Sequence, residues 1–159
     1  MKKEQSVQWG PLAISLLISL GTGALSGFLT RNSMERYQAL ETPPLAPPGW
    51  VFPLVWSILF ALMGVAAYLV WVQRSPQGRS TLALYGFQLA VNFVWPILFF
   101  CYGLFFPAFL WLLLLIALVT ALLFRFYAIR PAAGWLLLPY LVWILFAGYL
   151  NFGVWALNR

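Results

Sequence analysis

Amide side chains inside long apolar segments are the groups of this sequence with the clearest capacity for binding chemistry. Gln88 and Asn92 lie four residues apart, and Asn151 lies in a later apolar segment. A buried polar side chain is costly in lipid, so each amide needs a hydrogen-bond partner. Two interpretations remain open for each: it bonds a neighbouring helix, or it bonds a ligand held between helices.

Aromatic residues extend the faces on which these amides lie. Residues that share a face at helical spacing are Gln88, Asn92, Trp95 and Phe99; Tyr140, Trp143, Ala147 and Asn151; and Pro53, Trp56 and Phe60. Trp56, Trp95, Trp111 and Trp143 lie deep in their segments, whereas Trp9, Trp50, Trp71, Trp135 and Trp155 lie near segment ends. Interfacial anchoring is the favoured interpretation of the second group, and Trp50 fits it least well. Packing could explain the first, but a cavity lined by indoles and amides would suit a flat aromatic ligand.

Prolines add to the prediction of a cavity. Pro53, Pro96, Pro107 and Pro139 lie within or near the starts of apolar segments. An internal proline removes a backbone hydrogen bond and kinks a helix, and kinks open space between helices.

The chain lacks, or places outside its apolar segments, the residue types that several kinds of chemistry need. The chain has no His, and Cys101 is its one cysteine, which excludes an internal disulfide and a cysteine-based zinc cage. Glu4, Glu35 and Glu41 are the three acidic residues, and all lie outside the apolar segments. Proton-driven carriers usually place carboxylates or His inside the membrane, so this mechanism is disfavoured. We expect no metal site and no resident cofactor.

The composition predicts an all-α integral membrane protein. Of 159 residues, 64% are hydrophobic and 8% charged, whereas a soluble domain is about 45–50% apolar and about 25% charged. Five segments are long enough to cross a bilayer: 11–29, 51–72, 82–101, 104–124 and 133–156. We therefore expect a single domain, a bundle of five transmembrane helices.

The basic residues predict an orientation. Lys2, Lys3, Arg74, Arg79, Arg125 and Arg130 fall on one side of the membrane, and Arg31, Arg36 and Arg159 on the other. The positive-inside rule then places the N-terminus in the cytoplasm and the C-terminus outside, as in a bacterial inner or plasma membrane. The net charge of +6 is scattered over helix ends and forms no stripe, so we expect a lipid membrane and no nucleic acid as partner.

The first apolar segment has an alternative interpretation. Lys2-Lys3 followed by an apolar run could be a signal peptide, but the run is long and no small-x-small cleavage site follows. We expect an uncleaved helix. Small residues recur along it at Ser15, Ser19, Gly23 and Gly27, and along the third segment at Gly86 and Ala90. Such stripes allow close helix contact. We expect the stripe on the first segment to make contacts within the chain. The stripe on the third segment could make contacts within the chain or with a second copy in a homodimer.

The connection between the first two segments is unusually long, from Thr30 to Trp50. Long connections are often functional. Part of it, 33–41, could form one or two amphipathic turns with Met34, Tyr37 and Leu40 on one face.

Three ordered motifs resemble one known family. PPLAPPGWVFPLVW at 43–56, QLAVNFVWPILFF at 88–100 and PYLVWILFAGYLNFGVWALN at 139–158 are similar to the TspO/MBR family of tryptophan-rich sensory proteins, also called translocator proteins or peripheral benzodiazepine receptors. With five segments and a long first loop, the resemblance covers nearly the whole chain. It implies a five-helix bundle that binds hydrophobic ligands between its helices, closed by the first loop as a lid.

The resemblance also implies a ligand and a site. Family ligands include protoporphyrin IX and other porphyrins, synthetic benzodiazepine-site drugs and, in animals, cholesterol. By motif position, the ligand-binding residues are Tyr37, Pro47, Trp56, Phe60, Asn92, Trp95, Trp143, Ala147 and Asn151, and Gln88 joins them as a hydrogen-bond donor. Arg31 or Arg36 could meet the porphyrin propionates. The sterol motif expected near the C-terminus is not matched, because Phe152 falls where a tyrosine is required.

Three functions follow as hypotheses. The first is a membrane receptor or sensor of tetrapyrroles. The second is an enzyme that degrades porphyrin in light, as some bacterial members of the family do with two tryptophans that fall here on Trp56 and Trp143. The third is a porphyrin or sterol transporter, which ranks last because no coupling-ion site is visible. In each, the porphyrin would be ligand or substrate and not a resident cofactor.

Overall fold

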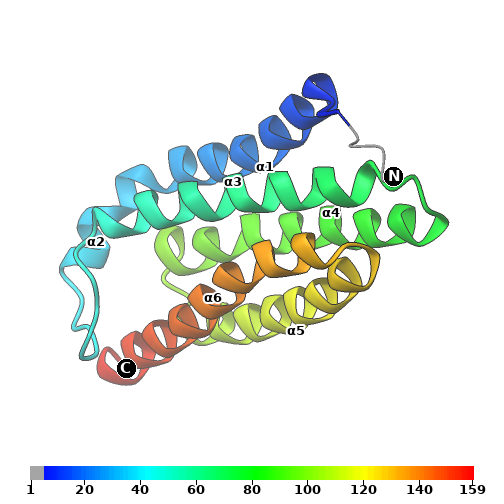
Figure 1. Cartoon of the computed structure of the whole chain (residues 1–159). Coiled ribbons are helices and arrows are strands. Elements are labelled where there is room, and N and C mark those ends of the chain that lie inside the picture. Colours follow the sequence, from blue (N-terminus) through cyan, green and yellow to red (C-terminus); the bar gives the residue numbers. More distant parts are fainter. Residues whose placement is uncertain (1–5) are drawn as a thin grey trace.

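The computed structural model describes residues 6–159, and every secondary-structure element in this range is a helix. The long helices are α1 (Trp9–Thr30), α3 (Val51–Trp71), α4 (Pro76–Pro96), α5 (Phe105–Ile129) and α6 (Pro131–Leu157). Within the described residues, five helices are long and apolar enough to cross a membrane. They run side by side (Figure 1), in the order α1, α3, α6, α5, α4 around the bundle. The predicted fold of five transmembrane helices is confirmed.

Helix α4 begins at Pro76, well before the apolar run that starts at Leu82. Ser75 caps it, since its hydroxyl oxygen accepts a 3.0 Å hydrogen bond from the Gly78 N–H, and proline suits the first helical turn. The opening turns are polar, which is why hydropathy alone places the start too late. At its other end α4 passes through Pro96 into a π-helical segment, η2 (Ile97–Cys101). The proline removes a backbone donor there, and the change of helix type absorbs it.

Helix α1 is the least buried of the five, and it turns its small polar residues inward. Ser19 and Ser26 are its buried residues, whereas Leu17, Ile18 and Phe28 are exposed. The Ser15 hydroxyl donates to the Gly64 carbonyl of α3 at 2.6 Å. A side chain added at Gly23 would strike the Phe60 ring, and one at Gly64 would lie 2.6 Å from the Ser19 hydroxyl oxygen. Along most of the stripe, small residues therefore bring α1 against α3, as expected within one chain.

The stripe on α4 behaves differently. Gly86 and Ala90 are exposed, and a side chain at Gly86 would meet nothing within 4 Å. Neither position is therefore covered, and Gly86 borders a groove between α1, α3 and α4.

The arginines divide between the two ends of the bundle. Arg74, Arg79, Arg125 and Arg130 lie at the end where α3 and α5 finish, and Arg31, Arg36 and Arg159 at the end where α1 and α6 finish. Lys2 and Lys3 lie outside the described residues. The structure therefore has two ends of unequal positive charge.

Candidate functional site

A cavity of about 910 Å³ lies between α1, α3 and α4 near the end of the bundle that carries the first loop. Its aromatic lining consists of Trp50, Phe52, Trp56, Phe60, Trp95 and Phe100. Its polar lining consists of Ser26, Thr30, Arg31, Gln38, Ser57 and Asn92. Ligand pockets usually measure about 300–1,000 Å³ and combine apolar walls with a few polar groups. The cavity is thus large enough for a flat molecule of several fused or linked rings.

Trp56 is the centre of the aromatic wall. Its ring centroid lies 5.7 Å from that of Phe60, 6.4 Å from that of Trp95 and 6.1 Å from that of Tyr140. Trp95 in turn stacks on Phe99 at 5.5 Å. Rings at these separations attract one another and hold their planes in fixed directions. A ligand between α1 and α3 would therefore meet a preformed aromatic surface.

A hydrogen-bond network lies behind that surface. The Asn92 amide donates to the Tyr140 hydroxyl at 2.6 Å, and this hydroxyl donates to the Gln88 amide oxygen at 2.9 Å. The Trp95 indole donates to Asn151 at 3.0 Å. All three amides are buried. Bonding between helices thus accounts for all three, and Asn92 alone among them also lines the cavity.

The ligand-binding residues expected from the sequence divide into two groups. Trp56, Phe60, Asn92 and Trp95 line the cavity. The remaining six do not line it: Tyr37, Pro47, Gln88, Trp143, Ala147 and Asn151. Tyr37 contacts the rings of Phe52 and Phe100, both of which line the cavity. Pro47 is half-buried in the loop, and Ala147 is buried on α6. The role of all ten residues in ligand binding stays a prediction.

Trp143 occupies a separate position from Trp56. Its ring lies beside Phe52, at a centroid distance of 6.1 Å, and also packs on Phe146, and it does not line the cavity. Its indole nitrogen is buried and has no hydrogen-bond partner among the described residues. A buried unpaired donor is costly, so this N–H is a group that a bound molecule or a water could satisfy. Trp111 differs, because its indole donates to the Val91 carbonyl at 2.7 Å and so has a structural role.

The wall contributed by α1 was missed from the sequence. Leu20, Gly23, Ala24, Ser26, Gly27 and Thr30 all line the cavity. The small-residue stripe was the available signal, but it predicted only helix contact. Leu20, Ala24 and Gly27 are also exposed, so the cavity opens sideways along α1, toward the surrounding lipid.

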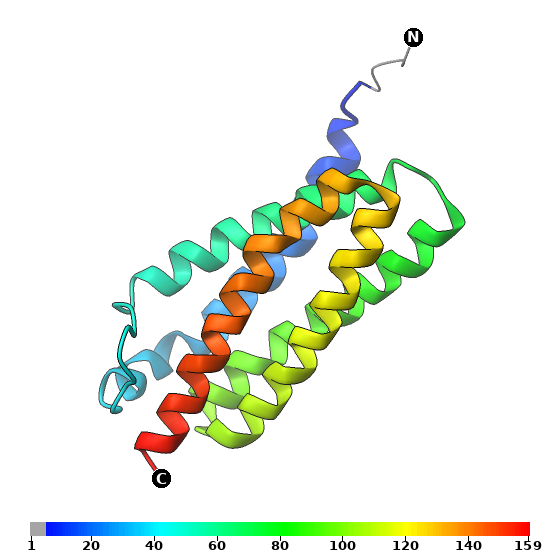
Figure 2. The same cartoon turned by 60° about the horizontal axis from the view of Figure 1, so that its bottom comes forward.

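The first loop closes the end of the bundle. A short helix, α2 (Met34–Gln38), buries Tyr37 and follows the 3-10 turn η1 (Arg31–Ser33). The Arg36 guanidinium donates to the Cys101 carbonyl at 3.0 Å, which fixes α2 to η2. Residues 39–50 then cross to the end of α6, and Figure 2 shows this loop beside the C-terminal turns.

Asn158 fastens the loop to α6. Its side-chain oxygen accepts from the Glu41 N–H at 3.0 Å, and its side-chain nitrogen donates to the Glu41 carbonyl at 2.7 Å. The Tyr149 hydroxyl donates to the Pro44 carbonyl at 2.8 Å. Pro43 is buried so close to Gly153 that a methyl group there would lie 2.5 Å from the proline ring. The loop therefore has three attachment points on one helix.

We predict that Asn158→Ala loosens this loop. Two hydrogen bonds to one backbone unit are lost, each contributing about 1 kcal/mol, so amides in 39–50 should exchange with deuterium at least about tenfold faster. Hydrogen exchange followed by mass spectrometry measures this. Arg159→Gln, at the neighbouring exposed residue, should leave exchange unchanged. Equal exchange in Asn158→Ala and the wild type would show that other contacts hold the loop.

Residues 6–159 contain no cluster of three or more His, Cys, Asp or Glu side chains that could hold a metal ion. The cavity lining supplies aromatic rings for stacking, amides and hydroxyls for hydrogen bonding, and Arg31 for charge pairing.

Comparison with known proteins identifies relatives over nearly the whole chain. The model of the TspO/MBR family matches residues 13–156. The translocator protein of Bos taurus is 37% identical over 156 residues, covering 95% of this chain and 92% of the relative. The tryptophan-rich protein TspO of Archaeoglobus fulgidus is 38% identical over 150 residues, covering 92% and 96%. The tryptophan-rich sensory protein of Cereibacter sphaeroides is 35% identical over 153 residues, covering 96% and 94%.

Proposed function

Because this chain belongs to the TspO/MBR family, we propose that it is a membrane receptor that binds a porphyrin, or another flat hydrophobic molecule, between α1, α3 and α4. The observation that carries this proposal is the cavity of about 910 Å³ with its aromatic wall. Protoporphyrin IX is the ligand we favour, since it is flat, apolar over its faces and acidic at one edge. A metal-free porphyrin needs no axial ligand, which suits a chain without His.

The cavity offers partners for both the apolar ring faces and the acidic edge of such a ligand. Trp56, Phe60 and Trp95 would stack on the ring faces. Arg31 lines the same cavity and would pair with a propionate, because a guanidinium binds a carboxylate through two parallel hydrogen bonds. The opening along α1 gives an apolar ligand a route from the bilayer. The loop fastened by Asn158 would then act as a lid over the end of the site.

The proposal includes an orientation and an assembly. The end with Arg74, Arg79, Arg125 and Arg130 would face the cytoplasm of a bacterial inner or plasma membrane, by the positive-inside rule. The exposed Gly86 and Ala90 would allow close approach of a second copy in a homodimer.

A second candidate function is light-dependent degradation of the bound porphyrin. Trp56 lines the cavity, so its indole would lie beside a photoexcited porphyrin and could donate an electron to it, with molecular oxygen as the final oxidant. Trp143 packs beside Phe52 and does not line the cavity, so it would take part through a second contact or after a side-chain movement. This observation favours Trp56 as the residue that reacts first.

Trp56→Ala should weaken the binding of protoporphyrin IX about thirtyfold. Removing the indole removes about 2 kcal/mol of apolar and stacking contact. Binding is measured in the dark by quenching of tryptophan fluorescence in detergent. Trp135→Ala is the matched control, because Trp135 is exposed on α6 and packs on Tyr127, outside the cavity.

The same samples separate the two functions under illumination. A receptor binds saturably and leaves the porphyrin absorbance intact, whereas an enzyme consumes the porphyrin only when protein, light and oxygen are all present. Trp56→Phe keeps a ring for stacking and should keep most of the affinity, but it should lose light-driven turnover. Equal affinity in Trp56→Ala and wild type would reject the proposed site.

A further inference from the structure

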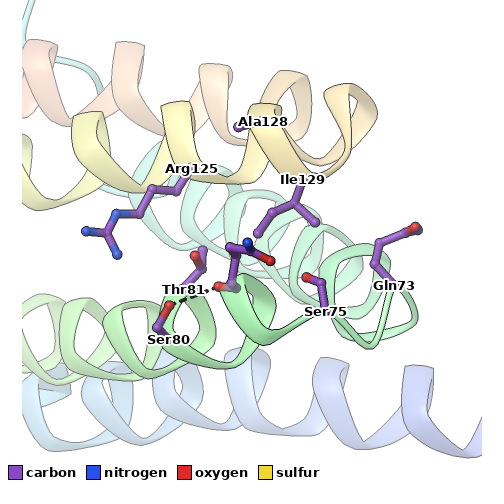
Figure 3. A pocket seen from close by; sticks show the side chains of 8 residues that line it. Gln73, Ser75, Ser80, Thr81, Arg125, Ala128 and Ile129 are labelled. Atoms are coloured by element: carbon purple, nitrogen blue, oxygen red, sulfur yellow. Dashed lines mark hydrogen bonds between the residues drawn. The ribbon is translucent and has the colours of Figure 1, made fainter.

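A second pocket, of about 580 Å³, lies at the opposite end of the bundle from the aromatic cavity. It is lined by Gln73, Ser75, Gln77, Ser80, Thr81, Arg125, Ala128 and Ile129. Figure 3 shows Arg125 extending from α5 into the space above α4, with Ser80 and Thr81 on the facing turns of α4. The pocket therefore joins a guanidinium to hydroxyl and amide groups from the first turns of a helix.

Thr81 is a buried residue that borders the pocket, and its hydroxyl has no hydrogen-bond partner among the described residues. Its side chain is 2% exposed. Three other helical threonines, Thr22, Thr30 and Thr120, donate to the carbonyl four residues earlier. The Thr81 hydroxyl makes no such bond, nor any other among residues 6–159, although it borders the pocket. Polar groups in buried residues are usually hydrogen-bonded, and because Thr81 borders the pocket, water or a bound molecule can supply the partner.

The electrostatics of the pocket favour an anion. The first turn of α4 offers one free backbone donor, the Gln77 N–H, because Pro76 has no N–H and the N–H groups of Gly78 and Arg79 bond to Ser75. The helix start still carries partial positive charge. Arg125 adds a full charge, and Arg74 and Arg79 lie beside the same turn in sequence. Both acidic residues of the described chain, Glu35 and Glu41, lie at the other end of the bundle. Among residues 6–159 these donors have no carboxylate nearby, an arrangement that selects negatively charged oxygen.

The position of the pocket indicates the kind of anion. It lies at the polar ends of membrane-spanning helices, at the depth where phospholipid headgroups lie. Basic pockets between transmembrane helices bind anionic headgroups. We propose that this pocket binds a negatively charged phosphate group, either in the headgroup of an anionic phospholipid or as soluble phosphate. Arg125 pairs with the phosphate, and the Thr81 hydroxyl and the Gln77 N–H donate hydrogen bonds to it. The Ser80 hydroxyl already donates to the Gln77 carbonyl at 3.1 Å. This site is independent of the porphyrin cavity.

The test compares three probes on the purified full chain in dodecyl maltoside: short-chain phosphatidylglycerol, short-chain phosphatidylcholine and inorganic phosphate. Native mass spectrometry measures the bound lipids, and equilibrium dialysis measures labelled phosphate. We expect saturable binding of phosphatidylglycerol or phosphate and weaker binding of the zwitterionic lipid. Arg125→Gln should weaken binding about tenfold, and Thr81→Val about fivefold.

Two further variants make the assignment specific. Thr81→Ser retains the hydroxyl and should retain affinity, which separates a hydrogen bond from a packing effect. Arg159→Gln removes one charge at the other end of the bundle and should also retain affinity. Saturable binding of phosphatidylglycerol alone identifies a lipid site, and equal binding of inorganic phosphate identifies a soluble-anion site. The proposal is overturned if neither phosphatidylglycerol nor inorganic phosphate binds saturably. It is also overturned if Arg125→Gln and Thr81→Val bind these probes as the wild type does.

Discussion

Replacing Gly27 with phenylalanine should lower the affinity for protoporphyrin IX about 100-fold while leaving the protein folded. Gly27 lines the aromatic cavity, and a side chain added there meets nothing within 4 Å. A phenyl ring can therefore enter the cavity without striking the backbone and occupy space that the ligand needs. Expelling or distorting it would cost up to about 3 kcal/mol. Fluorescence titration in the dark measures the affinity.

Gly21→Phe is the matched control for this experiment. Gly21 lies on the same helix, is equally open, and does not line the cavity. The two variants make the same chemical change, so any general effect on α1 appears in both. An unchanged affinity in Gly27→Phe, or an equal loss in Gly21→Phe, would place the ligand outside this cavity.

Gly134→Ala should destabilise the bundle by about 3 kcal/mol. Gly134 lies in the first turns of α6, where the chain reverses direction after α5. A methyl group there would lie 2.5 Å from the Tyr127 Cβ and 2.8 Å from its Cα. These atoms belong to the backbone of α5 or are fixed to it, so the helices themselves must separate. Overpacking of this kind costs about 1–3 kcal/mol, and unfolding in increasing sodium dodecyl sulfate measures the loss.

Gly86→Ala provides the comparison for the stability measurement. A methyl group at Gly86 meets nothing within 4 Å, so the intrinsic preference of alanine for helix should leave stability unchanged or raise it by less than about 1 kcal/mol. If Gly134→Ala is as stable as Gly86→Ala, then α5 and α6 are not packed as closely at this turn as the structure has them.

The fold was predictable because lipid imposes a strong constraint on sequence. A spanning segment must be long and apolar, and five such segments stand out. The starts of helices were less predictable, because α4 opens with polar turns at Pro76. The π-helical segment after Pro96 could not be predicted, since the proline indicates a kink and not the form it takes.

The site was predictable only in part, because its shape depends on how helices rotate against one another. Helical spacing placed Asn92 and Trp95 on one face of α4, and both line the cavity. Spacing could not say that Trp56 lines the cavity while Trp143 does not, because Trp56 and Trp143 come from different helices. Gly27 belongs to a stripe that elsewhere packs on α3, but a side chain at Gly27 itself would meet nothing within 4 Å, and Gly27 lines the cavity instead.

A structure of the protein with protoporphyrin IX, prepared in the dark, tests the central claim most directly. We expect porphyrin density between α1, α3 and α4, with the ring plane against Trp56 and Trp95 and a propionate at Arg31. Density on the outer surface of the bundle, or at the opposite end beside Arg125, would contradict it.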